Sequence, residues 1–249
     1  MASQRASEQP PISVRLRRVL IRESAPPIQA QEVWGRAALN RIVRALPPFE
    51  RAYATIRFSI MRPKLVSVLD LLLPDEGRIL DIGCGFGLFA AYFAQTQERR
   101  RITGVDLDGR RTKMAAQVFE RLGLEGHRFF SADAHSPELE GPFDGAYLLD
   151  VMHHVPRDGQ LPLLQRIHDL LKPGGVFLMK DITTEPWFGL KFTEVLDRVM
   201  VGMEDPLCYR HHTEWGEMLR SIGFKVRVVR VPDILPYPHV VIAATKAGG

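Results

Sequence analysis

The chain has 249 residues, of which 45% are hydrophobic and 25% are charged. These values exclude a disordered or collagen-like chain, and the length suits one large domain, or one domain with an extension. Residues 1–64 carry 12 basic and 4 acidic side chains, a net charge of +8, whereas the remainder has 21 basic and 25 acidic side chains, a net charge of −4. This asymmetry favours an anionic partner or surface for the amino-terminal part.

Two further features concern compartment and metal binding. The amino terminus lacks an apolar signal-peptide core, and no segment approaches the roughly 20 apolar residues of a membrane span. Cys84 and Cys208 stand far apart, outside any CxxC or Cys/His spacing. We therefore expect a cytoplasmic protein with neither a disulfide framework nor a metal site, and peripheral membrane contact through the basic extension is a hypothesis.

The first part of the chain is predicted to be helical. Apolar residues recur at helical spacing over residues 29–46 and 49–60, and the Pro47-Pro48 pair separates the two series. Pro63 opens a third short helix that runs through Leu73. Residues 1–73 are thus interpreted as a basic helical extension or lid, of which about the first ten residues are expected to be disordered.

After Pro74, apolar runs of strand length alternate with helical segments, which predicts a parallel sheet covered on both faces. The loop 232–238 is too short for a crossover helix, so the last two strands should pair antiparallel. Residues 74–249 are therefore predicted to form a doubly wound α/β domain. The predicted strands are 78–82, 101–106, 127–130, 143–149, 175–179, 225–231 and 239–244, and the predicted helices are 87–97, 109–122, 160–171 and 213–222.

The strongest motif is the segment Ile79-Leu-Asp-Ile-Gly-Cys-Gly-Phe-Gly87, in which a strand delivers Asp81 and then three glycines into a turn that opens a helix. Glycines allow the backbone to turn tightly and to approach a ligand closely. A dinucleotide fingerprint would require glycine at Leu88, and an acid before the glycines would repel a pyrophosphate. A carboxylate there suits a ligand that carries an ammonium group and a sulfonium.

In these features the chain resembles the class I S-adenosylmethionine-dependent methyltransferases, whose first motif is an acidic residue followed by GxGxG. The resemblance covers about Asp75 to Lys246 and implies a Rossmann-like seven-stranded sheet with an antiparallel C-terminal hairpin. It also implies S-adenosyl-L-methionine as the cofactor. Four further motifs of the family follow in order: Gly104-Val-Asp-Leu-Asp108, Phe130-Ser-Ala-Asp-Ala134, Phe143 to Val155, and Leu170 to Met179.

The resemblance assigns roles to individual residues. Asp106, which stands 25 residues after Asp81, matches the acid that accepts both ribose hydroxyls. Asp133 matches the residue that binds the adenine amino group, Ala134 supplies a backbone donor to the ring, and Asp150 lines the methionine end. The expected cofactor-binding set is Asp81, Gly83, Cys84, Gly85, Asp106, Leu107, Asp133, Ala134 and Asp150.

Methyl transfer needs a general base only if the acceptor atom is protonated. Histidine is the natural candidate, and the chain offers His154 and His153 just beyond the fourth strand and His211 after the fifth. Open α/β sheets bind ligands beyond the carboxyl ends of their strands, which places the first pair near the transferable methyl group. The alternative is that these histidines only structure the loop or pack.

The acceptor is predicted to be a small or lipid-like molecule. Because the amino-terminal extension is basic, we also hypothesise that the acceptor carries an anionic group. Enzymes that methylate nucleobase amino groups have an (Asn/Asp/Ser)-Pro-Pro-(Tyr/Phe) motif where this chain has Asp150-Val-Met-His, so nucleic acid is not expected. Residues 182–216 form an aromatic-rich insertion in which Trp187 and Tyr209 are candidate acceptor contacts. The alternative is that these aromatics merely cover the sheet.

Other functions remain open at this point. A lipid carbon-methylating or cyclopropane-forming enzyme is one, because His154-Val155 resembles the end of that family's fourth-strand motif, although His153 stands where its acid is expected. A non-catalytic S-adenosylmethionine-binding protein is another, opposed by the completeness of the motifs. A nicotinamide-dependent oxidoreductase is opposed by Leu88 and by Asp81. The sequence gives no oligomeric state.

Overall fold

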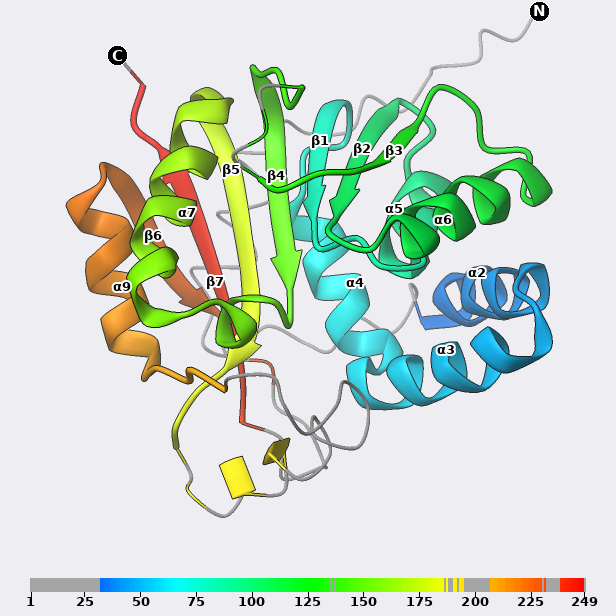
Figure 1. Cartoon of the computed structure of the whole chain (residues 1–249), viewed down its shortest axis with the longest axis horizontal. Coiled ribbons are helices and arrows are strands. Elements are labelled where there is room, and N and C mark those ends of the chain that lie inside the picture. Colours follow the sequence, from blue (N-terminus) through cyan, green and yellow to red (C-terminus); the bar gives the residue numbers. More distant parts are fainter. Residues whose placement is uncertain are drawn as a thin grey trace, which may run out of the picture.

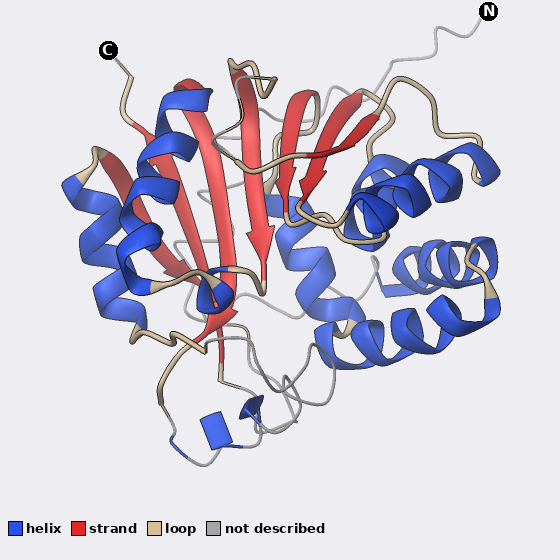
Figure 2. Ribbon diagram, viewed as in Figure 1, coloured by secondary structure: helices blue, strands red, loops and turns tan. Residues whose placement is uncertain are grey.

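The structure is a computed structural model that describes residues 32–134, 136, 138–185, 187, 190, 191, 193, 194, 207–229, 231 and 238–248. Its centre is a seven-stranded sheet in the order β3-β2-β1-β4-β5-β7-β6, flanked by helices (Figures 1 and 2). The strands are β1 (Gly77–Ile82), β2 (Arg100–Asp106), β3 (Arg128–Ser131), β4 (Phe143–Leu149), β5 (Leu171–Ile182), β6 (Phe224–Val229) and β7 (His239–Lys246). The helices are α2 (Glu32–Ala45), α3 (Pro48–Met61), α4 (Pro63–Leu72), α5 (Leu88–Thr96), α6 (Gly109–Arg121), the short η1 (Met152–His154), α7 (Arg157–Leu170) and α9 (His212–Ser221).

The predicted sheet topology is confirmed. Strands β1 to β5 pair parallel, and β7 pairs antiparallel with both β5 and β6. Strand β5 begins at Leu171, earlier than the predicted residue 175, because Leu171 already pairs with Phe143 before the register shifts. The predicted doubly wound α/β fold with an antiparallel C-terminal hairpin is therefore what the chain forms.

Both faces of the sheet are buried, which explains why the central strands are apolar at consecutive positions. Successive residues of β4 point to opposite faces: Tyr147 belongs to the core beneath α5 and the N-terminal helices, and Leu148 to the core beneath α7 and α9. The same alternation separates Leu178 from Phe177 on β5. A strand that is covered on both sides needs hydrophobic residues in both registers.

The N-terminal helices belong to the first of these cores. Ala38, Ile42 and Leu46 of the predicted first helical series are buried beside the residues of α5. Pro48 and Pro63 each occupy a first-turn position, where the missing N–H costs nothing. The predicted helices are confirmed over residues 32–72, whereas the expected disorder of the first ten residues lies outside the described residues. The division of the chain into 1–73 and 74–249 stays a prediction.

A buried arginine joins this helical part to the sheet. Arg100 at the start of β2 is fully buried, and its Nη1 donates to Asp70 Oδ1 on α4 at 2.5 Å and to Phe93 O on α5 at 3.1 Å. Its Nε donates to Pro74 O at 2.7 Å and its Nη2 to Asp70 O at 3.0 Å. One guanidinium therefore satisfies several backbone carbonyls where α4, α5 and β2 meet.

The position of the site follows from the strand order. Strand β1 lies between β2 and β4, so the chain reverses its direction of winding there, and such a switch point opens a crevice at the carboxyl ends of the strands. These ends point toward the side of the molecule where α3 lies (Figure 1). Within the part of the chain that the structure describes, no helix is both long and apolar enough to cross a membrane.

Candidate active site

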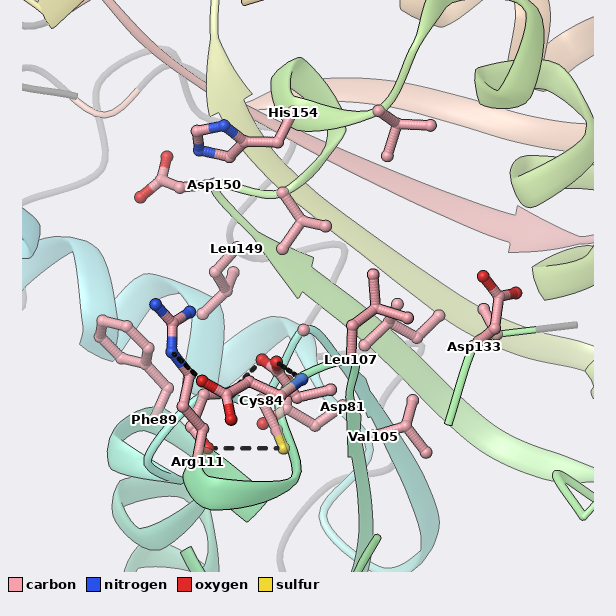
Figure 3. Close-up of a pocket in the computed structure, with 18 of the residues that line it drawn as sticks. Asp81, Cys84, Phe89, Val105, Leu107, Arg111, Asp133, Leu149, Asp150 and His154 are labelled. Carbon is pink, nitrogen blue, oxygen red and sulfur yellow. Dashed lines mark hydrogen bonds and ion pairs between the residues drawn. The ribbon is translucent and has the colours of Figure 1, made fainter. Parts of the chain in front are cut away.

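A cavity of about 750 Å³ lies at the carboxyl ends of β1, β2 and β4. Figure 3 shows Asp150 and His154 together on one side of it and Asp133 on another. Every residue of the predicted cofactor-binding set lines this cavity, as do His153 and His154. The tertiary structure thus brings together residues that the sequence places between positions 81 and 154, and the volume falls within the usual range of ligand sites.

The glycine-rich turn after β1 forms one wall of the cavity. The backbone N–H of Gly83 donates to Val105 O at 2.8 Å, and Gly83 has a φ of 73°. A Cβ on Gly83 would lie 2.5 Å from Val151 Cγ2, so the turn leaves no room for a side chain there. At Gly85, by contrast, an added Cβ would meet no atom within 4 Å, which leaves the backbone open to a ligand.

Asp106 lies at the end of β2 and is fixed by the backbone. Its Oδ2 accepts a hydrogen bond from Gly85 N at 2.9 Å, and its Oδ1 accepts one from Asp108 N at 2.9 Å. Each carboxylate oxygen has a second lone pair for a ligand. The carboxylate is therefore pre-oriented at the cavity wall and can accept two neighbouring hydroxyl groups.

Asp81 gives the cavity an unusual electrostatic character. Burial raises the pKa of its carboxyl group to about 8, a hydrogen bond from Tyr147 opposes this rise, and the nearby Asp106 adds to it. Only 4% of the residue is exposed. A cationic ligand in the cavity would favour the ionised carboxylate, so the site is suited to a positive group next to a polyhydroxyl group.

We expect the cofactor-free Asp81→Asn variant to be more stable than the wild type. Folding raises the pKa of Asp81 from 3.8 to about 8, so the folded state retains a proton that the unfolded state releases. The resulting stability is fully present below about pH 4 and is lost as the pH rises through about 8. The variant should therefore exceed the wild type in Tm by more than about 5 °C at pH 8, with the difference shrinking toward pH 4. Thermal unfolding followed by circular dichroism across this pH range measures it, and equal Tm values at every pH would refute the buried neutral carboxyl group.

A cluster of charges lies in the cavity wall that follows β4. Asp150 follows β4 with a φ of 58°, and it pairs with the buried Lys180 of β5 and with Arg57 of α3, whose Nη2 lies 3.1 Å from Asp150 Oδ2. Burial alone would raise the pKa of Asp150, but Lys180 and Arg57 outweigh it and hold that pKa below its usual range. Arg57 shows that the N-terminal helices reach the site directly.

His153 is held in a fixed orientation beside this cluster. Its Nδ1 lies 2.5 Å from Asp181 Oδ1, and both side chains are almost fully buried. Asp181 Oδ1 also accepts a hydrogen bond from Ile182 N at 2.7 Å. The ring of Tyr209 stacks on the His153 ring at 5.3 Å, and the His154 ring lies 4.1 Å from it. A histidine with a carboxylate on Nδ1 is arranged as a general base that acts through Nε2.

Gln160 of α7 supports this arrangement, and sequence reasoning missed it. Its side chain is fully buried, and its Nε2 lies within hydrogen-bond distance of Met152 O, Val155 O and Cys208 O, at 3.2, 3.0 and 3.1 Å. Its Oε1 accepts from Arg210 Nε at 2.6 Å. Gln160 therefore links the turn that carries His153 and His154 to Cys208 and Arg210 by hydrogen bonds. The one signal in the sequence was a polar residue at a position of a predicted helix that faces the core.

The remaining predicted residues lie elsewhere. His211 is the N-cap of α9, where its side chain accepts from Thr213 N, and its Nε2 is 3.6 Å from Glu185 Oε2. Trp187 is 73% exposed. Neither is among the residues that line the cavity, nor is Tyr209, whose ring stacks on His153 of the lining. A catalytic role for His211 and an acceptor contact for Trp187 stay predictions.

The fold and the site define a Rossmann-like protein with a cavity for a nucleoside-type ligand. The family described as "Methyltransferase domain" matches residues 53–229. With this match and the motifs of β1, β2 and β4, the chain belongs to the class I S-adenosylmethionine-dependent methyltransferases, and the predicted family is confirmed.

Individual relatives support the same family. The chain is 27% identical over 156 residues to the ubiquinone biosynthesis O-methyltransferase of Pseudomonas aeruginosa (strain UCBPP-PA14), covering 60% of this chain and 65% of that protein. It is 37% identical over 108 residues to the protein of the same name from Caulobacter sp. (strain K31), covering 43% and 41%. An O-methyltransferase family protein from Burkholderia thailandensis superposes with a TM-score of 0.64 at 17% identity, covering 89% and 70%. The chain thus spans less than two thirds of these curated relatives, and the structural likeness shows the fold alone.

Proposed function

We propose that the protein is a methyltransferase that transfers a methyl group from S-adenosylmethionine to a hydroxyl group of a small-molecule or lipid-like acceptor. The observation that carries this proposal is that one cavity is lined both by the acidic and glycine residues of the cofactor motif and by His153, which Asp181 orients. The O-methyltransferase names of the relatives support a hydroxyl acceptor.

The residues around the cavity fit S-adenosylmethionine. Asp106 would accept the two ribose hydroxyls, and Asp81 would face the positive methionine end, where a cation removes the cost of its buried charge. Asp133 and the backbone of Ala134 would hold the adenine, while Leu107, which is 76% exposed, would cover it. Gly83, Cys84 and Gly85 would pass beside the ligand, and Asp150 would line its methionine end.

The bound cofactor would supply an activated methyl group on a sulfonium, whose sulfur would leave as a neutral thioether. His153 would accept the hydroxyl proton on Nε2, because Asp181 holds the proton on Nδ1. Lys180 and Arg57 would keep Asp150 ionised and in place. His154 would line the acceptor end. Much of the rate would come from alignment of the oxygen with the sulfur–methyl bond.

The partners follow from this site. The acceptor is proposed to be small or lipid-like, and an anionic acceptor is compatible with Arg57 in the cavity lining. Nucleic acid stays an unexpected substrate, because the turn after β4 carries no nucleobase motif. A cytoplasmic location with peripheral membrane contact is likewise a proposal, supported by the basic amino-terminal part of the sequence.

Replacing Asp106 with asparagine tests the cofactor site. The variant loses one carboxylate oxygen and the negative charge, so S-adenosylmethionine should bind roughly 100-fold more weakly in isothermal titration calorimetry. Asp169→Asn is the matched control, because Asp169 is exposed near the end of α7 and is not among the residues that line the cavity, so affinity should change little. Undiminished affinity in Asp106→Asn would contradict the ribose assignment.

The acceptor class needs a separate experiment. The full chain, incubated with methyl-labelled S-adenosylmethionine and a cell extract, should transfer label to a small molecule that is then assigned to the lipid or the aqueous fraction by mass spectrometry. Label in nucleic acid or protein, or no binding of S-adenosylmethionine by the wild type, would overturn the proposed function.

A further inference from the structure

Helix α3 presents an apolar surface to solvent. Phe49 is 84% exposed and Ile56 is 48% exposed, and the exposed Ala52 lies between them. These residues are spaced by three and four positions, so they lie on one face of the helix. The opposite face is buried through residues such as Phe58. Because scattered single apolar residues are ordinary on protein surfaces, a row of them along one helix requires a specific explanation.

The same helix borders the cavity. Tyr53 and Arg57 line the cavity, and each is one position after a member of the exposed face. One turn beyond Ile56, Ile60 packs in a small cluster with Ile182 and Tyr209. The exposed face therefore runs beside the cavity-lining residues of α3 and ends next to Tyr209, whose ring stacks on His153.

A second segment adds to this surface. Leu190 of the insertion packs against the same cluster as Ile60. Trp187, three positions before Leu190 in the sequence, is 73% exposed. Both α3 and this part of the insertion lie at the edge of the molecule toward which the parallel strands point (Figure 1). Exposed apolar side chains thus come from two segments, α3 and the insertion, that both contribute to the cluster of Ile60.

Arginines surround the end of this surface where α2 turns into α3. Arg51 donates from Nε to Leu46 O at 2.7 Å and from Nη2 to Arg44 O at 3.1 Å. Arg121 of α6 donates from Nη1 to Ala45 O at 2.7 Å. Arg44, Arg51 and Arg121 are all exposed. Against these three arginines the corner has Glu50, in the first turn of α3, so the corner beside Phe49 has a net positive charge.

We propose that this surface, formed by Phe49, Ile56 and Trp187 with the arginines of the α2–α3 corner, docks onto an anionic lipid membrane. Apolar side chains on a helix enter the boundary between head groups and acyl chains, while arginines bind the lipid phosphates. The charge favours anionic lipid over a second copy of this basic surface. This inference rests on the proposed function, since docking would place the cavity mouth at the bilayer and make a membrane-dissolved acceptor accessible.

Vesicle co-sedimentation of the full chain tests the proposal. We expect binding to phosphatidylcholine vesicles that contain phosphatidylglycerol, weaker binding to phosphatidylcholine alone, and release by salt. The double variant Phe49→Ser/Ile56→Ser should partition about tenfold less. Arg44→Gln should partition roughly fivefold less. Leu161→Ser on α7 is the matched control, because Leu161 is 43% exposed and lies outside this surface.

S-adenosylmethionine affinity, measured in every variant, separates this inference from the proposed function. Unchanged affinity together with lost vesicle binding in the double variant supports membrane docking. Absence of vesicle binding by the wild type at low salt, or equal binding by the double variant, overturns the docking while leaving the enzyme proposal intact. A wild-type dimer that the double variant converts to a monomer would also overturn it, because the surface would then join two copies of the chain.

Discussion

Replacing His153 with glutamine is expected to lower kcat by about 100-fold to 10,000-fold, the range by which a positioned general base contributes to a rate. Glutamine preserves much of the volume of the side chain but cannot accept the hydroxyl proton. Asp181→Asn should also lower kcat, because an amide can no longer hold the proton on Nδ1 of His153 as a carboxylate does. The measurement is steady-state transfer of labelled methyl to the identified acceptor.

The matched control is His154→Gln, because His154 also lines the cavity and is adjacent in the chain. We expect it to lower kcat by less than about tenfold if His153 is the base. S-adenosylmethionine affinity should be preserved in both variants. A kcat near that of the wild type in His153→Gln would show that positioning alone drives the transfer.

Replacing Arg100 with methionine is expected to lower the free energy of unfolding by about 3–5 kcal/mol, the cost of breaking a buried ion pair by removal of one partner. The variant leaves the carboxylate of Asp70 and the carbonyls of Pro74 and Phe93 without the guanidinium that now satisfies them. At about 2–4 °C per kcal/mol, Tm should fall by roughly 6–20 °C. Urea unfolding followed by circular dichroism measures the effect.

The neighbouring residue supplies the control. The Arg99 side chain is 76% exposed and pairs with Glu76 at 3.2 Å, so Arg99→Met should cost less than about 1 kcal/mol. Adding Asp70→Leu to Arg100→Met should recover part of the lost stability, because the unpaired charge is removed as well. Equal effects of Arg99→Met and Arg100→Met would contradict a specific role for the buried cluster.

The sequence by itself determined the fold and the cofactor end of the cavity. After Pro74 the spacing of apolar residues alternates between that of strands and that of helices. The glycines of the first motif predict a tight turn. Asp81, Asp106 and Asp133 each follow or end a parallel strand. Because the carboxyl ends of neighbouring parallel strands meet at one edge of the sheet, residues so placed must converge. Strand patterns together with the family resemblance therefore predicted one site for these acids, and in the structure all three line one cavity.

The tertiary structure alone decided the surroundings of Asp150 and His153. Asp181 pairs with His153 across 28 positions, Arg57 reaches Asp150 across 93, and Gln160 reaches Cys208 across 48. None of these pairs carries a local pattern, because each depends on how β4, β5, α3 and α7 pack. The sequence favoured the pair His153 and His154 over His211 but did not distinguish within the pair, whereas burial beside Asp181 distinguishes His153, and His211 caps α9. Local periodicity determines which elements form, but only packing determines which side chains from distant elements meet.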